Sequence, residues 1–122
     1  MTPVQEARAL IDRRYAEPMT VSEIARRCRL SRAHFIRTFR AEIGQTPHQY
    51  RRARRIGRAK ELLATTSMPI TDICQAVGFR SLGSFCTVFR RLTHQTPAGW
   101  RAGHRRPPII PGCFLRMYRA DR

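Results

Sequence analysis

Acidic residues are scarce in this sequence of 122 residues, which has 8 Asp and Glu against 24 Lys and Arg and a formal net charge of +16. Lysine is almost absent as well, since Lys60 is the single lysine. So large an excess of positive charge favours a polyanionic partner, either nucleic acid or an acidic membrane surface. A GC-rich genome would explain the use of arginine in place of lysine, but it would not explain the missing acids.

Long apolar runs are also missing. No stretch approaches ~18 consecutive apolar residues, which excludes a membrane-spanning helix. The N-terminal segment MTPVQEARAL lacks the charged-then-apolar order of a signal peptide. We therefore expect a cytoplasmic protein that binds no membrane.

The residues of metal and catalytic sites do not gather into known patterns. The carboxylates are scattered, and no Ser/His/Asp or Cys/His set, glycine-rich phosphate loop or HExxH motif is present. We expect neither a cofactor nor an enzymatic activity. The cysteines form no CxxC pair, which predicts free thiols at Cys28, Cys74, Cys86 and Cys113. The histidines lack the spacing of metal ligands, which predicts surface side chains and no metal site at His34, His48, His94 and His104.

What the sequence does contain is an internal repeat. Segment 35–51 matches segment 85–101 at a shift of 50 residues, and the match continues upstream at a shift of 49, from Val21 against Ile70 to Cys28 against Val77. The extra residue of the second copy falls near 80–82, where a turn would tolerate it. Seven of 17 positions are identical, namely Phe35/Phe85, Phe39/Phe89, Arg40/Arg90, Gln45/Gln95, Thr46/Thr96, Pro47/Pro97 and Arg51/Arg101.

Each copy carries the signals of a short helix, a tight turn and a longer helix. In the first copy, at about 20–43, TVSE predicts a capping box in which Thr20 caps and Glu23 reaches back. Ser31 caps the longer helix, and Gly44 suits the left-handed residue that ends it. The expected core residues are Val21, Ile24, Ala25, Cys28, Phe35, Thr38, Phe39 and Ile43.

The second copy, at about 70–93, follows the same plan, with a turn at 78–79 and a longer helix that buries Phe85, Val88 and Phe89. His94 stands where the first copy has glycine. This helix should therefore end on a left-handed residue that carries a side chain, at some cost in stability. A short helix, a tight turn and a longer helix with arginines on its outer face are typical of a helix-turn-helix.

Three further helices are predicted outside the repeated motifs. Thr46 and Pro47 open a long helix at about 47–65 between the copies, a second helix runs from Thr2 to about Tyr15, and a short one at 97–100 closes the domain. The expected core faces of the first two are Tyr50, Ala53, Ile56, Ala59, Leu62 and Leu63, and Val4, Ala7, Leu10 and Ile11.

The predicted fold class is therefore all-α. About seven helices form one domain at 1–102, in which two helix-turn-helix subdomains are joined by the long central helix. An irregular C-terminal tail follows at 103–122, where the prolines argue against a helix. Within the tail, Cys113–Tyr118 is apolar enough for a short strand or for packing on the domain surface.

These residues resemble a known family. The F-x-x-x-F-R helices, GQTPHQYRR, RRIGRAKELL and above all ITDICQAVGFRSLGSFCTVFRRLTHQTPAGWR are similar to the DNA-binding domain of AraC/XylS-type bacterial transcription regulators, over about residues 5–102. The resemblance implies that the second helix of each copy enters successive major-groove segments on one face of double-stranded DNA. It also implies activation of transcription through RNA polymerase, and binding as a monomer if the domain stands alone or as a dimer only through a missing domain.

The outer faces of the two longer helices supply the candidate DNA contacts. The resemblance places base contacts at Arg32, Ala33, Ile36, Arg37, Leu82, Gly83, Cys86 and Thr87. Arg37 suits guanine, because a bidentate arginine bond to O6 and N7 is the commonest specific pairing. The second helix offers few hydrogen-bonding groups, so weaker sequence demands are expected there. Contacts to DNA phosphates are predicted at Ser31, Arg40, Arg51, Ser81, Arg90 and Arg101.

Two other functions would share this charge. A non-specific architectural protein that binds DNA or RNA needs a basic surface, but it has no use for two matched helix-turn-helix motifs. The DNA-targeting domain of a larger repair enzyme would require a catalytic module elsewhere. If the chain is a regulator, both second helices run in the same direction along one chain, so the DNA site should be asymmetric or directly repeated.

Overall fold

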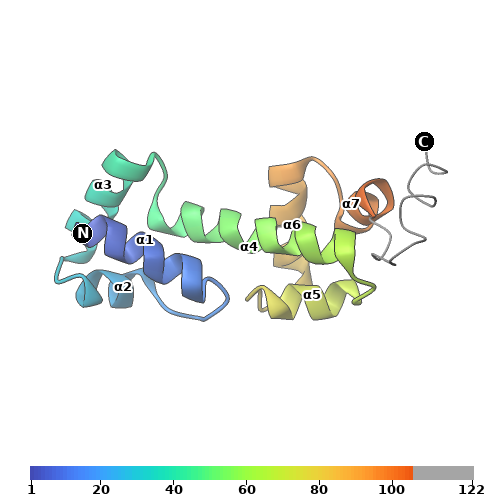
Figure 1. Ribbon diagram of the computed structural model, residues 1–122, viewed down its shortest axis with the longest axis horizontal. Helices are drawn as coiled ribbons and strands as arrows, with labels where there is room; N and C mark the ends of the chain where they lie inside the picture. Colours follow the sequence, from blue (N-terminus) through green and yellow to red (C-terminus); the bar gives the residue numbers. More distant parts are fainter. Residues whose placement is uncertain (106–122) are drawn as a thin grey trace, which may run out of the picture.

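The computed structural model describes residues 1–105, which form seven α-helices and no strand (Figure 1). In chain order these are α1 (Pro3–Arg14), α2 (Val21–Arg27), α3 (Arg32–Ile43), α4 (Pro47–Thr65), α5 (Ile70–Ala76), α6 (Leu82–Thr93) and α7 (Pro97–His104). The predicted all-α fold, with a long helix between two helix-turn-helix units, is confirmed. The segment Cys113–Tyr118, for which a strand or surface packing was expected, lies outside the described residues.

The molecule is elongated, with one group of helices at each end of α4 (Figure 1). Each group has its own hydrophobic core. The first, from α1, α2 and α3, consists of Val4, Ala7, Leu10, Ile11, Ile24, Ala25, Cys28, Phe35 and Phe39. The second, from α4, α5 and α6, consists of Ile56, Ala59, Leu63, Ile73, Cys74, Val77, Phe85 and Phe89. Each core fits the helical spacing of apolar residues in the sequence.

Aromatic side chains explain much of the repeat. In each copy two phenylalanines, one turn apart on the longer helix, contact each other, and the second contacts an aromatic residue of the following helix. Such edge-to-face or tilted contacts add to the free energy gained by burying the rings. The centroid distances are 5.6 Å for Phe35–Phe39 and 5.7 Å for Phe39–Tyr50, against 5.8 Å for Phe85–Phe89 and 6.1 Å for Phe89–Trp100.

The helix caps lie where the sequence predicts them, but one predicted hydrogen bond is not formed. The Thr20 hydroxyl accepts a hydrogen bond from the Glu23 amide at 3.1 Å, as predicted. The return bond from the Glu23 side chain is not formed within the described residues, so Thr20 caps α2 without a full box. Complete capping boxes, which were not predicted, join Thr2 to Gln5 and Thr46 to Gln49, because glutamine can make the return bond as glutamate does.

Left-handed residues end the longer helices and form the tight turns. Gly44 (φ 88°) and His94 (φ 63°) end α3 and α6, which confirms the expectation for His94. In the turn before α6 the left-handed residue is Gly78 (φ 98°), and in the turn before α3 it is Arg29 (φ 61°). Arginine in this conformation was not foreseen. It shows that the first turn leaves room for a side chain.

His94→Gly is expected to raise the free energy of unfolding by about 0.5–1 kcal/mol, because glycine adopts the left-handed conformation without the clash of a Cβ. Urea unfolding followed by circular dichroism measures the change. His94→Ala is the matched control and should give no gain, since alanine keeps the Cβ. Equal stability of the glycine and alanine variants would contradict this account of the helix end.

The last helix is longer than expected. It was predicted to end at Trp100, whereas α7 continues to His104, inside the segment that was assigned to the tail. The His104 ring stacks on the Trp100 ring with centroids 3.6 Å apart, and its Nδ1 lies 3.0 Å from the Trp100 carbonyl oxygen. The Lys60 ammonium also lies over the Trp100 ring, 5.0 Å from its centroid. These contacts connect the extra turn, through Trp100, with α4.

The two subdomains also touch each other beside α4. The Arg55 guanidinium donates from Nε to the Tyr15 carbonyl at 2.6 Å and from Nη2 to the Glu17 carbonyl at 3.1 Å. The same group lies 5.8 Å from the Phe79 ring centroid. Arg55 therefore connects the loop before α2 with the turn before α6, so that one side chain contacts both subdomains.

Candidate nucleic-acid interface

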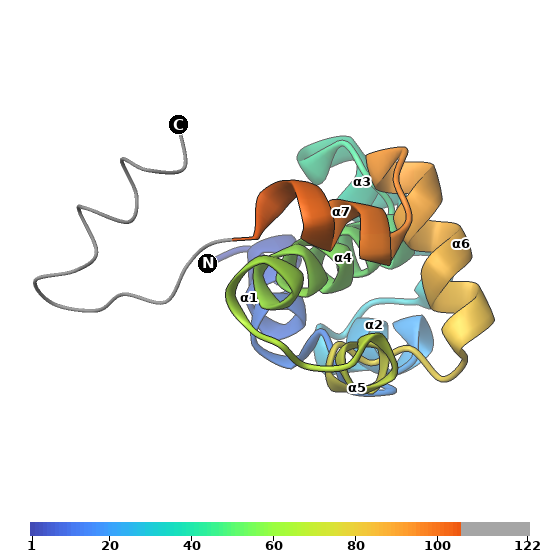
Figure 2. The same ribbon diagram turned by 90° about the vertical axis from the view of Figure 1, so that its right-hand side faces the viewer.

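The two longer helices of the repeat, α3 and α6, expose matching faces. Both have 12 residues, and both begin at a serine whose hydroxyl accepts from the amide three residues on, at 3.2 Å for Ser31 and 3.0 Å for Ser81. Segments 31–40 and 81–90 have nearly the same pattern of burial, in which only the two phenylalanines are fully buried. Both helices run across α4 rather than along it (Figure 1), and α6 lies on the opposite side of α4 from α1 (Figure 2).

The residues predicted to contact bases lie together on these exposed faces. Ile36 and Cys86, which occupy equivalent positions, are half-buried against their own subdomains. Leu82 is 42% exposed at the first position of α6. The remaining five, all exposed, are Arg32, Ala33, Arg37, Gly83 and Thr87. Their placement leaves every one of the eight accessible to a partner.

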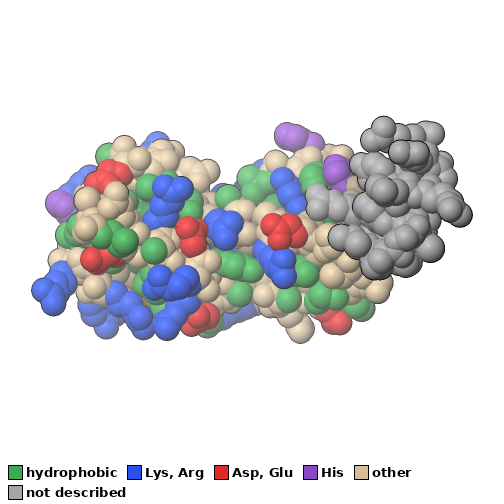
Figure 3. Space-filling view, viewed as in Figure 1, with side chains coloured by type: hydrophobic (Ala, Val, Ile, Leu, Met, Phe, Trp, Pro, Cys, Tyr) green, Lys and Arg blue, Asp and Glu red, His purple; other side chains and the backbone are tan. Residues whose placement is uncertain are grey.

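The arginines on these helices carry charge without a partner of opposite sign. The three ion pairs among the described residues are Arg14–Glu17, Arg54–Asp12 and Arg58–Glu61, on α1, α4 and the loop between α1 and α2. Figure 3 shows the face that carries α1, where arginines are interspersed with acidic side chains. Neither α3 nor α6 has an acidic residue in its first turn. Their exposed cations are thus free to meet an anion.

Two arginines that were expected to contact phosphates serve the protein itself. A guanidinium N–H of Arg51 donates to the Met19 carbonyl. At the equivalent place in the second copy, Arg101 donates from Nη2 to the Met68 carbonyl at 2.7 Å and from Nε to the Leu63 carbonyl at 3.1 Å. Both side chains fix the chain just before the first helix of their motif, which explains why the repeat retains them. This role was not predicted from the sequence.

Arg101→Ala is expected to lower the free energy of unfolding by about 1–3 kcal/mol, because buried carbonyls lose a charged donor. Arg90→Ala is the matched control. The Arg90 side chain is exposed and makes no hydrogen bond or ion pair with the other residues in 1–105, so its loss should change stability by less than about 0.5 kcal/mol and weaken DNA binding instead. Thermal unfolding and DNA titration separate the two effects. Equal stability losses would contradict the structural role of Arg101.

The thiols and histidines form no metal cluster in the described part of the chain, where no group of three or more His, Cys, Asp or Glu side chains lies together. Cys28 and Cys74 are buried free thiols, and burial raises the pKa of each. A raised pKa lowers the reactivity of a thiol at neutral pH. Within residues 1–105, no helix combines the length and apolarity that crossing a bilayer would require.

Comparison with known proteins agrees with this geometry. Residues 24–103 match a family model described as a helix-turn-helix domain. The chain is 35% identical over 98 residues to the regulatory protein SoxS of Escherichia coli K12, which covers 80% of this chain and 92% of SoxS. The chain belongs to the AraC-type helix-turn-helix family. It is accordingly a sequence-specific DNA-binding transcription regulator of the AraC type.

Solved structures of AraC-type domains have the same fold. The DNA-binding domain of AdpA, a global transcriptional factor solved in complex with a target DNA, superposes with a TM-score of 0.81 at 31% identity, covering 84% of this chain and 93% of that one. An AraC-type regulator from Chromobacterium violaceum has a TM-score of 0.77 at 32% identity, covering 87% and 95%. The match thus extends over nearly the whole of both solved domains.

Some relatives are longer than this chain. The probable transcriptional regulator LumQ of Photobacterium leiognathi is 32% identical over 91 residues, which is 75% of this chain and 37% of LumQ. The bifunctional transcriptional activator/DNA repair enzyme AdaA of Bacillus subtilis is 36% identical over 91 residues, again 75% of this chain and 43% of AdaA. The matched region therefore makes up most of SoxS but less than half of LumQ and of AdaA.

Proposed function

We propose that the chain inserts α3 and α6 into successive major-groove segments on one face of double-stranded DNA. The observation that carries this proposal is the matched pair of exposed helices at the two ends of α4. The 19 residues of α4 span ~28 Å at 1.5 Å per residue. This length suits the roughly 34 Å between major grooves that face the same side. The similar AdpA domain, which was solved with a target DNA bound, supports the same mode here.

The residues proposed to contact bases lie on both helices, and their chemistry differs. On α3, Arg37 pairs with a guanine, while Ala33 and Ile36 meet thymine methyl groups. On α6, Leu82 and Thr87 offer little hydrogen bonding, so this helix reads methyl groups and DNA shape. The other proposed base contacts are Arg32, Gly83 and Cys86.

For the DNA backbone we propose Ser31, Arg40, Ser81 and Arg90, which are exposed at the ends of the two helices. These groups position the helices without reading sequence. Arg51 and Arg101 have guanidinium groups that already donate to carbonyls of the chain. We therefore assign both a structural role, and the phosphate contact expected from the sequence stays a prediction for them.

The chain is proposed to act in the cytoplasm as a monomer on an asymmetric or directly repeated site. Both helices belong to one polypeptide and follow each other in the same direction, so a palindrome would not match them. SoxS, a regulatory protein matched over 92% of its length, supports the idea that a regulator can be about this short.

We further propose that the bound chain activates transcription by contacting RNA polymerase. The relative AdaA is a transcriptional activator as well as a repair enzyme, which supports this direction. In a purified transcription assay with a promoter that carries the selected site, the chain should increase transcript yield. A decrease in yield would indicate a repressor instead.

Selection of bound sequences from a random DNA pool of ~30 base pairs, at about 150 mM salt, tests the DNA-reading proposal. We expect an enriched motif with two boxes about one helical turn apart. An unenriched pool would favour the architectural alternative, because a non-specific binder retains affinity but has no preferred sequence. In AdaA transcriptional activation and DNA repair occur in one protein, so the third function does not exclude the first.

A further inference from the structure

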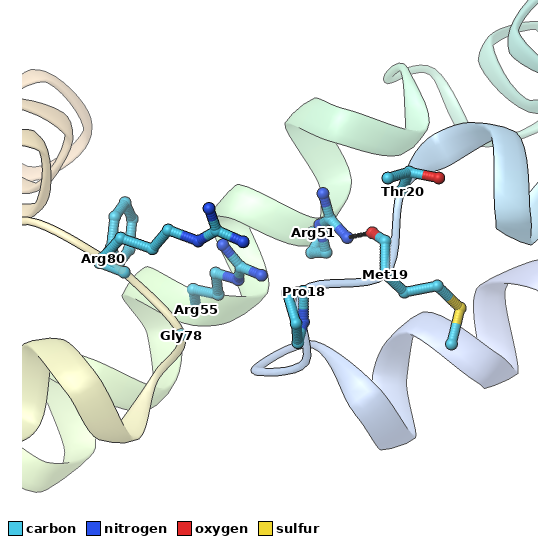
Figure 4. Close-up of a pocket in the computed structure, with 8 residues that line it drawn as sticks. Pro18, Met19, Thr20, Arg51, Arg55, Gly78 and Arg80 are labelled. Carbon is cyan, nitrogen blue, oxygen red and sulfur yellow. Dashed lines mark hydrogen bonds between the residues drawn. The ribbon is translucent and has the colours of Figure 1, made fainter.

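A pocket of about 240 Å³ opens between the two subdomains (Figure 4). Its walls come from the loop before α2, from α4 and from the turn between α5 and α6. It is far larger than the ~30 Å³ that one water molecule occupies, so it has room for a substantial polar group. The lining residues that bear on its chemistry are Thr20, Arg51, Arg55, Gly78, Phe79 and Arg80.

The pocket gathers positive charge without an acid. Three of its lining residues are arginines and none is Asp or Glu. In Figure 4 the side chains of Arg55 and Arg80 both extend into the space between the two subdomains. Burial, together with the charge of Arg51, lowers the pKa of Arg55 to about 10, so the group stays protonated at neutral pH. Like charges around one pocket repel one another, and an anion bound among the three arginines would relieve the repulsion.

Several donors in the pocket have no partner within the described residues. Arg55 uses Nε and Nη2 on the Tyr15 and Glu17 carbonyls, which fixes its plane and leaves Nη1 available to a ligand. Arg80 is exposed and makes no hydrogen bond or ion pair with other residues in 1–105. The Arg80 side chain can therefore bind a ligand at no cost in internal bonds.

Arg80 is the residue that the second copy has gained. In both copies an apolar residue of the turn donates to the carbonyl five residues earlier, from Leu30 to Ala25 and from Phe79 to Cys74, at 3.0 Å in each. In the first copy the capping serine follows Leu30 directly. In the second copy one residue stands between Phe79 and the capping serine, and that residue is Arg80. The insertion thus places a cation in the pocket that the first motif lacks.

We propose that this pocket binds a phosphate group, and that the phosphate belongs to the DNA strand that passes between the two major-groove segments. The inference rests on the proposed function. The pocket borders the beginning of α6 on one side and Thr20, the cap of α2, on the other. In helix-turn-helix proteins the second helix enters the groove by its N-terminal residues, and the first helix crosses the backbone. A backbone phosphate therefore passes close to this opening.

The test compares Arg80→Gln with wild type in titrations of the selected site between 50 and 200 mM salt. The salt slope is the steepness with which the logarithm of the binding constant falls with the logarithm of the salt concentration. Removing one phosphate contact should reduce this steepness by ~0.9, so that the factor by which affinity falls between 50 and 200 mM salt is about threefold smaller than for wild type. Arg13→Gln, which removes the same charge from the exposed face of α1, should leave the slope unchanged. A wild-type slope for Arg80→Gln would overturn the proposal. Circular dichroism checks that both variants keep the helical fold.

A duplex that carries a neutral methylphosphonate at successive positions between the boxes locates the contact. At one position the neutral linkage should weaken wild type about threefold and leave Arg80→Gln unaffected. If no position behaves in this way, the pocket does not bind a DNA phosphate.

Inorganic phosphate, titrated into the DNA-free protein and followed by amide NMR shifts, separates DNA from a free anion as the source. Submillimolar binding at Gly78, Phe79 and Arg80, combined with an unchanged salt slope for Arg80→Gln, would assign the pocket to a small phosphorylated molecule and overturn the DNA assignment. The DNA titrations, repeated with a duplex that lacks the selected site, give the ratio of specific to non-specific affinity for wild type. A ratio near one would contradict both the proposed function and this inference. A high ratio, combined with a wild-type salt slope for Arg80→Gln, would contradict the inference alone.

Discussion

Replacing Gly78 by alanine is expected to lower the free energy of unfolding by about 3 kcal/mol, the sum of backbone strain and overpacking. A Cβ at this position would lie 2.6 Å from the carbonyl oxygen and 2.8 Å from the Cα of Ala16. Both are backbone atoms, which no change of rotamer can move away. Urea unfolding followed by circular dichroism measures the loss.

Gly44→Ala is the matched control for this substitution. Gly44 is also left-handed, with φ of +88°, but a Cβ there would meet nothing within 4 Å. The expected loss is therefore only about 1 kcal/mol, the backbone term alone. The difference between the two variants measures the close approach of the first subdomain, through Ala16, to the turn before α6. Equal losses would mean that this approach does not hold in solution.

Arg37→Ala is expected to weaken binding to the selected site by about 1–3 kcal/mol, which is about 5- to 150-fold, and to relax sequence preference in one box only. The reason is that a bidentate arginine contact discriminates one base pair, while the second box is read by other residues. Repeating the selection with the variant, and titrating the wild-type site, measures both effects.

Thr87→Ala provides the comparison, because Thr87 stands 50 positions after Arg37 at the equivalent place on α6. A single hydroxyl offers no bidentate contact, so the loss should stay below about 1 kcal/mol. Equal losses for the two variants would contradict the proposed difference between the two helices. A uniform loss on all DNA sequences after Arg37→Ala would move this arginine from base to phosphate contact.

The helices and their cores could be predicted from sequence because their determinants are local. Phe35 and Phe39 lie one helical turn apart, and capping threonines and prolines stand at fixed distances from the residues that they serve. The left-handed end of α6 at His94 was predictable for the same reason, since the first copy supplies a glycine at the equivalent place.

The roles of Arg51 and Arg101 were not predictable from local pattern, because an arginine on a basic helix suits a phosphate and a distant carbonyl equally well. Their partners, Met19 and Met68, lie 32 and 33 residues away. A signal was present, however. The spacing between arginine and methionine recurs in both copies, as expected for a contact inside each motif. The approach of Gly78 to Ala16 had no such signal, since it joins the turn of the second motif to the loop before the first motif.

The central claim is that one chain holds two DNA-reading helices at a fixed spacing. A series of duplexes with five and ten base pairs inserted between the selected boxes tests it most directly. Five base pairs turn the second box to the opposite face, and ten move it about 34 Å further along the axis. We expect both insertions to reduce wild-type affinity to that of a duplex with one box. Unchanged affinity for either insertion would contradict the claim, because it would mean that the two helices bind independently.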